Sequence, residues 1–494
     1  MIISSQEPTY EQLSAQNSLL TQENQELKGD IFLLKQQLAQ LQRMIFGSRS
    51  ERFVPATDPL QGTLALNIEA LAEVEQKKQQ ISYTRTTTTV KKNNHQGRTP
   101  LPKHLPRVVH TLQPEENTEG LKLIGKEITE ELDFTPGKFF VNQFVRPKYA
   151  KPQGEGIAVA ALPSRPIEKG IAGVGLLSQI IIDKYVDHLP LHRQLQRFKR
   201  EDIHIAPSTI GDWVKYSCQL LAPLYEVLKE KVFSSSYLMA DESPIKVLDK
   251  DKPGATHQGY YWVYRSPLER LVLFDYRPSR GREGPTQMLE HFKGHLQTDG
   301  YSVYDPFDQT DGIVLMHCMA HGRRYFEHAL ENDKERAEYA LAQIQLLYKV
   351  ERQAKDQQLT HEQRLELRQS ESVPVLNTIE SWLKENMVQV LPKSLIGKAI
   401  SYNLARWDRL CIYAHHGHLE IDNNPVENSI RPIAIGRKNY LFAGSHDAAQ
   451  RAAVVYSLLG TCKINDINPY DWLKNTLAKI PDHKVNCLHE LLPL

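Results

Sequence analysis

A chain of 494 residues is too long for one hydrophobic core, so two to four domains are expected. Its apolar share of 40% and charged share of 24% are those of a soluble globular protein, and its longest apolar runs, such as residues 174–182, fall short of the roughly 20 residues that span a bilayer. The net charge of +1 identifies no partner, and the amino terminus carries no secretion signal. Five scattered cysteines argue against a disulfide framework and indicate reduced thiols in a cytoplasm.

The first expected element is a coiled coil over residues 10–46. Leucines recur at every seventh position, which keeps one apolar seam facing a partner helix. Asn17 and Asn24 fall at successive a positions, where Asn favours one register and most simply a parallel dimer. An amphipathic helix packed on its own domain is the alternative. We expect a homodimer joined through the d-position leucines Leu13, Leu20, Leu27, Leu34 and Leu41.

Residues 47–107 are expected to form a flexible basic linker. Between Gln76 and Pro114 the sequence has eight Lys or Arg residues and no acid, together with a threonine run and several Gly, Pro and Asn residues that do not support a packed core. Such an arm can neutralise DNA phosphates and release counterions. A solvated linker that happens to be basic is an equal alternative.

A small β-containing module is expected at 108–172, with strands at 139–145 and 157–161, and a helical region at 173–232. Helices at 174–185 and 189–200, a break at 202–206 and a helix opened by Ser208 as N-cap resemble a helix-turn-helix, although an ordinary helical pair fits as well. The helix at 189–200 presents a basic face suited to phosphates, with Arg193, Arg197, Lys199 and Arg200 as candidate DNA contacts.

From residue 235 the pattern changes to strands. Segments 237–247, 259–265 and 270–276 predict a three-stranded antiparallel meander, followed by a helix at 284–293 and strands at 295–298 and 312–318. This order, with Asp241 on the first strand and Asp299 ending the fourth, predicts a ribonuclease H-like core of α/β class. Two distant carboxylates would then meet at one edge of a sheet.

Carboxylates in that position suit the cleavage of a phosphodiester. Two Mg²⁺ ions can activate an attacking water or 3′-hydroxyl and stabilise the leaving oxygen. Mg²⁺ prefers the oxygen ligands that Asp and Glu supply. No phosphate-binding Gly-x-x-x-x-Gly-Lys loop is present, so ATP hydrolysis is not indicated.

Residues 327–410 read as a helical insertion, after which the segment IDNNPVENSIR offers the third acid. Pro425 suits a first helical turn, which puts Glu427 near a helix start and Arg431 one turn further on the same face. Asp422 and Glu427 are both candidates, and because they are five residues apart they cannot share a helix face. We choose Glu427. The core is thus expected at 233–326 and 411–444, with a helical region at 445–494.

Several longer motifs resemble the insertion-sequence-sixty-six family of bacterial transposases, in particular its large subunit, transposase C. The resemblance covers nearly the whole chain, from about residue 13 to 477. It rests on the zipper followed by MIFGSRSERF, and on RPKYA, PIEKGIAGVGLLSQIIIDKYVDHLPLHRQ, MADESPIKVL, TDGYSVY, HCMAHGRRYFEHA, LEIDNNPVENSIRPIAIGRKNYLFAGS and AAVVYSLLGTCKINDINPYDWL.

The resemblance implies a DNA transposase that cuts element ends and joins their 3′-hydroxyls to target DNA. It implies that Asp241, Asp299 and Glu427 form a DDE triad for two Mg²⁺ ions, with Mn²⁺ as a substitute. It also implies two small accessory proteins of the same element as partners, besides DNA and a second copy of the chain. No membrane partner is expected.

One departure concerns zinc. The family commonly has two Cys-x-x-Cys pairs in its small module, whereas this chain reads QPEENTEG and YAKPQGEG there, with Lys151 and Gly154 where the second pair would stand. A structural zinc site needs four soft or borderline ligands, and this module has none of those cysteines. We therefore expect the module to keep its shape without zinc, which leaves its DNA binding open.

Other residues suggest roles beside the triad. Cys318 and His321 are spaced as a Cys-x-x-His pair, which we expect to position the active site rather than to complete a zinc site with Cys411 and His415. Glu242 should face the opposite side of the strand from Asp241, so we exclude it as a ligand. Phosphate contacts are expected from Arg323 and Arg324, unless they pair with the insertion, and from Arg431, Arg437 and Lys438, of which the last two follow in a glycine-led turn that could equally be solvated.

Three rival functions remain at this stage. A catalytically silent DNA-binding regulator derived from a transposase is disfavoured because all three acids are present. A ribonuclease H-like nuclease or resolvase would have the same acids, so only the family motifs distinguish it from a transposase. A coiled-coil scaffold would not explain the placement of the acids.

Overall fold

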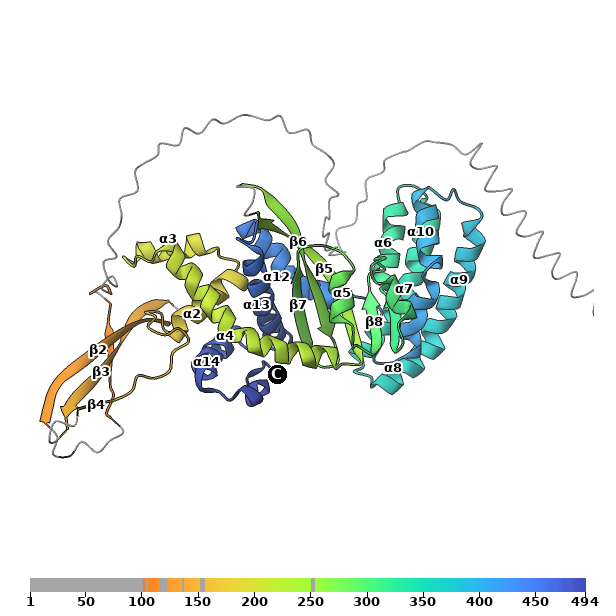
Figure 1. Ribbon diagram of the computed structural model, residues 1–494. Coiled ribbons are helices and arrows are strands. Elements are labelled where there is room, and N and C mark those ends of the chain that lie inside the picture. Colours follow the sequence, from red (N-terminus) through yellow and green to blue (C-terminus); the bar gives the residue numbers. More distant parts are fainter. Residues whose placement is uncertain are drawn as a thin grey trace, which may run out of the picture.

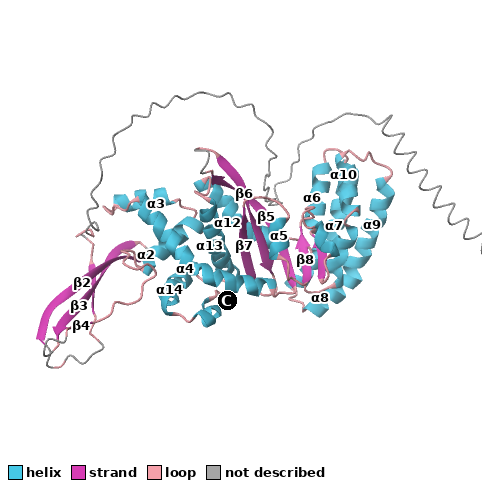
Figure 2. Ribbon diagram, in the orientation of Figure 1, coloured by secondary structure: helices cyan, strands magenta, loops and turns pink. Residues whose placement is uncertain are grey.

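The computed structural model describes residues 101–494, except for residues 104, 115–118, 120–121, 136, 152–155 and 250–253. Within these residues the fold is mixed α/β, with a four-stranded and a five-stranded sheet among many helices (Figures 1 and 2). The predicted coiled coil with its leucines and most of the basic linker fall outside the described residues. In the part of the chain that is described, no helix is long and apolar enough to cross a membrane.

The four-stranded sheet is built on a long hairpin that extends away from the rest of the molecule (Figure 1). β2 (Lys122–Thr135) and β3 (Lys138–Ala150) pair antiparallel, and β3 also pairs with β1 (Arg107–Thr111) in parallel and with β4 (Ile157–Val159) antiparallel. The structure differs from the prediction in two ways. β2 was not predicted, and β1 begins at Arg107, the last residue of the predicted linker.

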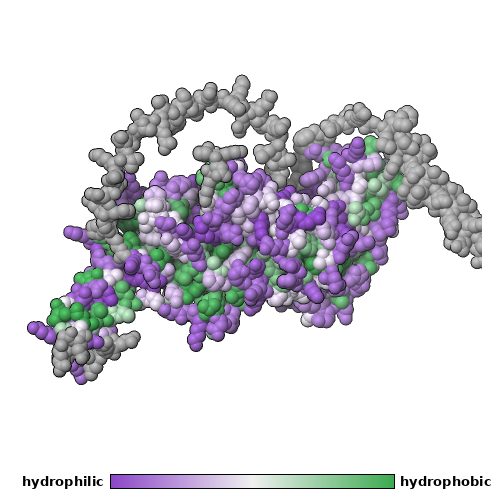
Figure 3. Space-filling model, in the orientation of Figure 1, coloured by the Kyte–Doolittle hydropathy of each residue, from purple (hydrophilic) through white to green (hydrophobic). Residues whose placement is uncertain are grey.

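The hairpin is most buried near its turn, where β2 ends and β3 begins. Leu132 and Val141 are buried there, whereas Leu123, Ile124 and Ile128 toward the other end are exposed, and apolar surface is visible on this arm in Figure 3. Because only one end of β2 is buried and charged residues alternate with apolar ones, its sequence gives a weak strand signal.

Three helices follow the hairpin: α2 (Val174–Tyr185), α3 (Leu191–Arg200) and α4 (Pro207–Phe233). The expectation that Ser208 caps α4 is wrong, because the N-cap is Ala206 and no side chain bonds to the helix start. Pro207 occupies the first helical position, where a residue without an N–H costs no hydrogen bond. The Arg197 guanidinium pairs with Asp183, so it joins α3 to α2.

The five-stranded sheet has the order β7-β6-β5-β8-β9. β5 is central; it pairs antiparallel with β6 and parallel with β8. The predicted antiparallel meander and the two strands after it are confirmed, but the helix expected at 284–293 ends earlier. The bounds are β5 (Tyr237–Leu248), β6 (Thr256–Ser266), β7 (Leu271–Arg277), α5 (Glu283–Met288), β8 (Gly294–Thr298) and β9 (Ile313–His317).

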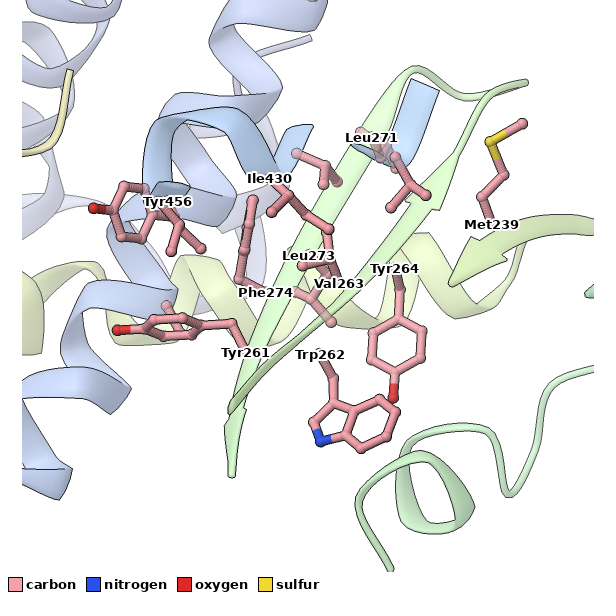
Figure 4. Packing of buried hydrophobic residues seen from close by; sticks show 14 of the residues in the cluster. Met239, Tyr261, Trp262, Val263, Tyr264, Leu271, Leu273, Phe274, Ile430 and Tyr456 are labelled. Carbon is pink, nitrogen blue, oxygen red and sulfur yellow. The ribbon is translucent and has the colours of Figure 1, made fainter. Parts of the chain in front are cut away.

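Both faces of this sheet are covered. Along β6, Tyr261 and Val263 alternate with Trp262 and Tyr264, and all four are buried (Figure 4). Tyr261 contacts Tyr456 of α13 (His446–Ile464) with ring centroids 6.2 Å apart. A strand buried on both faces reads as a continuous apolar run, as this one does.

Helix α13 also protects the free edge of β7. The backbone N–H of Phe274 donates to Ser457 Oγ (2.8 Å), and that of Val272 donates to Thr461 Oγ1 (3.3 Å). Gly460 allows this approach, because a Cβ there would lie 2.8 Å from Val272 Cγ1. The segment expected as a separate C-terminal helical region therefore caps an edge that could otherwise pair with another strand.

A helical block lies between β9 and α12 (Asn424–Tyr440), as predicted for the insertion, and it stands to one side of the sheet (Figure 1). Its elements are α6 (Met319–Ala329), α7 (Lys334–Asp356), α8 (His361–Leu367), the π-helix η3 (Arg368–Ser372), α9 (Val373–Met387), α10 (Leu395–Leu404), α11 (Trp407–Cys411) and the 3₁₀ helix η4 (Ile412–His415). The remaining helices are α14 (Pro469–Lys479) and the 3₁₀ helices η2 (Asp305–Gln309), η5 (Ile480–Asp482) and η6 (Val485–Leu491).

Three histidine rings meet where β8 begins. The His295 centroid lies 4.6 Å from that of His416 and 5.5 Å from that of His418. Burial, and then the charges of the other two rings, lowers the pKa of His295 to about 4; burial also lowers the pKa of His416 and of His418. These rings are neutral in the fold, so their contribution to stability is present above the ordinary histidine pKa of 6.5 and is lost as the pH falls toward 4.

We expect His295→Gln to reduce this loss of stability in acid. As the pH is lowered from about 7 to about 4, the melting temperature of the wild type should fall more steeply than that of the variant, because the variant has one fewer half-buried imidazole to protonate. Differential scanning calorimetry across this range measures the difference. His204→Gln, at an exposed histidine, is the control and should follow the wild type. Parallel curves for His295→Gln and the wild type would contradict the assignment.

Candidate active site

Asp241 and Asp299 lie side by side on neighbouring parallel strands. Asp241 is on the central strand β5, and Asp299 directly follows the last residue of β8. The register pairs Met239 with Gln297, so both acids stand two residues further along their strands. The sheet thus brings together two carboxylates that are 58 residues apart in the sequence.

The backbone around Asp299 is held firmly. Tyr402 Oη donates to the Asp299 carbonyl oxygen (2.7 Å), and Asp299 Oδ1 accepts from the N–H of Tyr301 (2.8 Å). Gly300 has a φ of +85°, and a Cβ there would lie 2.8 Å from Tyr402 Oη and 2.9 Å from Arg406 Nε. Only glycine fits this turn without displacing the groups that fix Asp299.

Glu427 is in the first turn of α12, as expected from Pro425. The start of this helix is tied to the sheet by Asn423, whose Nδ2 donates to the carbonyl oxygen of Ala240 (3.1 Å). Arg265 on β6 donates to the carbonyl oxygen of Pro425 (2.9 Å). These bonds set Glu427 beside the strand position that carries Asp241.

The Asp241 carboxylate is buried among other acids. Burial raises the pKa of Asp241 well above its usual range, and the negative charges of Glu242, Asp299 and Glu427 raise it further. Glu427 Oε1 is buried and has no hydrogen-bond partner; His321 Nε2 and an Arg324 nitrogen lie 3.8 and 3.7 Å from it. As the side chains stand, no group of three or more His, Cys, Asp or Glu among the described residues could hold a metal ion.

Comparison with known proteins connects this site to a family. The pattern of the Transposase IS66 family matches residues 169–451, which include all three acids and more than half of the chain. The chain belongs to this family. Residues 33–109 match a pattern described as "Transposase C of IS166 homeodomain", and residues 457–494 match one described as "IS66 C-terminal element".

Relatives of this IS66-family chain occur in Sinorhizobium fredii. The chain is 30% identical to the uncharacterized protein y4hP over 94% of its own length and 88% of that protein, and 29% identical to y4jD over 97% and 98%. It is 32% identical to y4qI over 89% of its own length and 84% of that protein. The resemblance inferred from the motifs is therefore confirmed at the level of the family.

Asp422, the other candidate for the third acid, is occupied by structural bonds in this IS66-family chain. Tyr348 Oη and Asn424 Nδ2 donate to its Oδ2 (3.0 and 2.8 Å), and the Asn424 N–H donates to its Oδ1 (3.0 Å). Burial, as the largest cause, raises the pKa of Asp422 to about 6. Its oxygens accept hydrogen bonds from Asn424 and Tyr348, whereas Glu427 Oε1 accepts none, which favours the choice of Glu427.

Cys318 and His321 lie on the way from β9 to the site. Cys318 Sγ is buried and accepts from the N–H of Asn423 (3.1 Å), so it helps to hold the start of α12. Burial lowers the pKa of His321, whose ring lies close to Glu427. Neither Cys411 nor His415 joins them in a metal-binding group among the residues described here.

Glu242 and Arg280 form an ion pair next to the site that was not predicted from the sequence. The Glu242 side chain is only 3% exposed and pairs with Arg280, which lies between β7 and α5. Burial, and then the charge of Asp299, raises the pKa of Glu242 to about 7. The adjacent acids Asp241 and Glu242 were the only signal in the sequence, and nothing in it indicated Arg280 as the partner.

The structure gives several of the expected DNA contacts other partners. Arg323 pairs with Glu327 in its own helix (2.8 Å) rather than with a later part of the insertion.

The expected glycine-led turn at Arg437 and Lys438 is wrong, because both residues are in the last turn of α12. Arg437 donates to Ser243 Oγ and to the Pro244 carbonyl oxygen (3.2 and 2.8 Å), while Lys438 is exposed. Arg193, Lys199 and Arg200 are exposed on α3.

Proposed function

We propose that this protein is the DNA transposase of a bacterial insertion sequence, with a ribonuclease H-like core formed by the five-stranded sheet. The observation that carries the proposal is that three acids come from elements that meet: β5, which bears Asp241, pairs in parallel with β8, which Asp299 follows, and the start of α12, which bears Glu427, bonds to the carbonyl oxygen of Ala240. Their position at one edge of a mixed sheet is the placement that metal-dependent phosphodiester cleavage needs.

The donor set fits a divalent metal. All three groups are carboxylates, which Mg²⁺ prefers, and Glu427 Oε1 accepts no hydrogen bond. Burial and the neighbouring carboxylates raise the pKa of Asp241, and a cation held among these groups would relieve their repulsion. We infer that Asp241, Asp299 and Glu427 hold two Mg²⁺ ions, with Mn²⁺ as a substitute, and that no zinc is bound. When bound, the ions supply activation of the attacking oxygen and stabilisation of the leaving one.

The remaining residues of the site hold its geometry. Tyr402 and Gly300 fix the peptide of Asp299, while Asn423 and Cys318 fix the start of the helix that bears Glu427. The lowered pKa of His321 keeps its imidazole neutral beside Glu427, so it can accept or donate one hydrogen bond without cancelling the acid's charge.

The wider organisation belongs to the same proposal. We infer that Arg324, Arg431 and Lys438 contact DNA phosphates near the site, that α3 contributes Arg193, Lys199 and Arg200, and that a dimer formed through residues 10–46 brings two element ends together. The proposal also includes the domain boundaries predicted from the sequence, action in the cytoplasm and the two accessory proteins.

A strand-transfer reaction tests this function. Purified protein is incubated with Mg²⁺, a plasmid and a duplex that carries the inverted repeat flanking the gene, with a free 3′-hydroxyl. We expect the duplex to be joined covalently to the plasmid, and a chelator to abolish joining. Binding of the duplex without joining would instead establish the silent regulator, and cleavage without joining would establish a nuclease.

A further inference from the structure

Two aromatic rings and a guanidinium form a stacked column beside the site. The rings of Tyr325 on α6 and Tyr402 on α10 are stacked, with centroids 4.1 Å apart and planes inclined by 21°. The Arg406 guanidinium carbon lies 4.3 Å from the centroid of Tyr402. Since both groups contact the same ring so closely, they cover its opposite faces.

The column is bonded to the peptide of Asp299. Tyr402 Oη donates to the Asp299 carbonyl oxygen (2.7 Å), and Arg406 donates to the carbonyl oxygen of Gly300 (3.2 Å). The inner two members of the stack thus fix the acid, and Tyr325 ends the column on the outside. It is 39% exposed, although its inner face is covered by Tyr402.

Packing between the helices does not require an aromatic ring at Tyr325. Helices α6 and α10 are already joined by Asn403, whose Nδ2 donates to the carbonyl oxygen of Gly322 (3.2 Å) in a buried contact. A Cβ at Gly322 would lie 2.3 Å from Asn403 Oδ1, so the two helices approach closely at that point. The outer face of the Tyr325 ring is therefore available to a ligand.

The surroundings of this face suit a nucleic acid. Arg323 and Arg324 precede Tyr325 in the sequence, and the side chain of Arg324 is 43% exposed and 3.7 Å from Glu427 Oε1. Cations attract the phosphates of a DNA strand, and an exposed ring can stack on one of its bases. Both groups lie beside the proposed metal-binding pocket, so a phosphate could enter the pocket while the neighbouring base contacts the ring.

We propose that the exposed face of Tyr325 stacks on an unpaired base of the DNA strand, next to the phosphate that enters the pocket at Asp299. The inference rests on the proposed function and adds a substrate feature to it: the DNA must be unpaired beside the cut. A base in a duplex has both faces covered by its neighbours, so only an unpaired base can offer a face. Stacking of this kind tolerates any base, since each has a π-face.

Fluorescence of 2-aminopurine tests the stacking apart from catalysis. The probe is the element-end duplex with 2-aminopurine in an unpaired stretch beside the cleavage position, and all proteins carry Asp241→Asn so that the DNA stays intact. We expect binding to quench the fluorescence, Tyr325→Ala to remove the quenching and to weaken binding about tenfold, and Tyr325→Trp to retain both. Tyr325→Leu, which keeps an apolar side chain, replaces the alanine variant if that variant does not fold.

Tyr339→Ala is the matched control. Tyr339 is 38% exposed and stacks on Trp382 with ring centroids 5.0 Å apart, but it lies on α7 in the insertion. This variant should keep the quenching, and a fully paired duplex should bind equally to all variants. Quenching that survives Tyr325→Ala or Tyr325→Leu, or that Tyr339→Ala removes as well, overturns the proposal. If Tyr325 quenches the probe but the protein without Asp241→Asn joins no DNA, the proposed function is wrong and the stacking is still supported.

Discussion

Asp241→Asn is expected to lower strand joining by about a thousandfold or more while leaving DNA binding intact. Metal ions contribute several kcal/mol of transition-state stabilisation, and about 4 kcal/mol corresponds to a factor of a thousand in rate. The neutral amide binds Mg²⁺ poorly, yet it has the size of the carboxylate. Rates are measured with the joining reaction, and binding is measured by fluorescence anisotropy.

The same variant should melt at a higher temperature than the wild type when no metal is present. The pKa of Asp241 is raised by burial and by its acidic neighbours, so its ionised form opposes folding at neutral pH, and the amide removes this cost. Mg²⁺ should then stabilise the wild type more than the variant, because only the wild type keeps the full binding site.

Asp422→Asn is the matched control for this prediction. It changes the same kind of side chain close to the site, at a residue whose oxygens bond to Tyr348 and Asn424. We expect a loss of less than about tenfold, as for a residue that positions others. Equal losses in the two variants would mean that the third acid is wrongly chosen, and full activity of Asp241→Asn would remove Asp241 from the site.

Arg368→Met is expected to destabilise the protein by about 3–5 kcal/mol, the usual cost of removing one partner from a buried ion pair. Arg368 is fully buried, and all five of its N–H groups are used. It donates to both oxygens of Glu351 (each 2.7 Å) and to the carbonyl oxygens of Tyr413, His416 and Leu419 (2.9, 2.6 and 2.8 Å). Methionine keeps most of the length but supplies none of these bonds.

Denaturant unfolding followed by tryptophan fluorescence measures this loss, since Trp382 and Trp407 lie in the helical block. Arg352→Met, at an exposed arginine on α7, is the control and should change the stability by no more than about 0.5 kcal/mol. The segment that Arg368 holds leads into α12, so joining activity should fall as well. A variant as stable as the wild type would show that the block does not depend on this arginine.

Sequence patterns predicted the parts of the fold that are regular and fully buried. The strands of the five-stranded sheet are runs of β-branched and aromatic residues, and Asp241 and Asp299 follow from the placement of acids on two of them. Pro425 indicated the start of the helix that carries Glu427. In each case the local residue types agree with the environment that the fold provides.

Other features depend on contacts that no local pattern reveals. Gly436 was taken as the start of a turn, but it lies inside α12, where a Cβ would be 2.6 Å from the Tyr440 ring; the glycine gives room for packing and does not end the helix. The partners of Arg368 are up to 51 residues away, and Tyr325 and Tyr402 are 77 residues apart, on α6 and α10. Residues of this kind become visible only in three dimensions.

Iron-induced cleavage of the protein chain tests most directly whether the three acids share a metal site. Fe²⁺ replaces Mg²⁺, and with ascorbate and peroxide it produces hydroxyl radicals that break the backbone close to where it is bound. We expect cuts near Asp241, Asp299 and Glu427, suppressed by excess Mg²⁺ and absent in Asp241→Asn. Cuts near only one of these residues, or a pattern that Asp241→Asn leaves unchanged, would contradict a common site and the enzyme proposed from it.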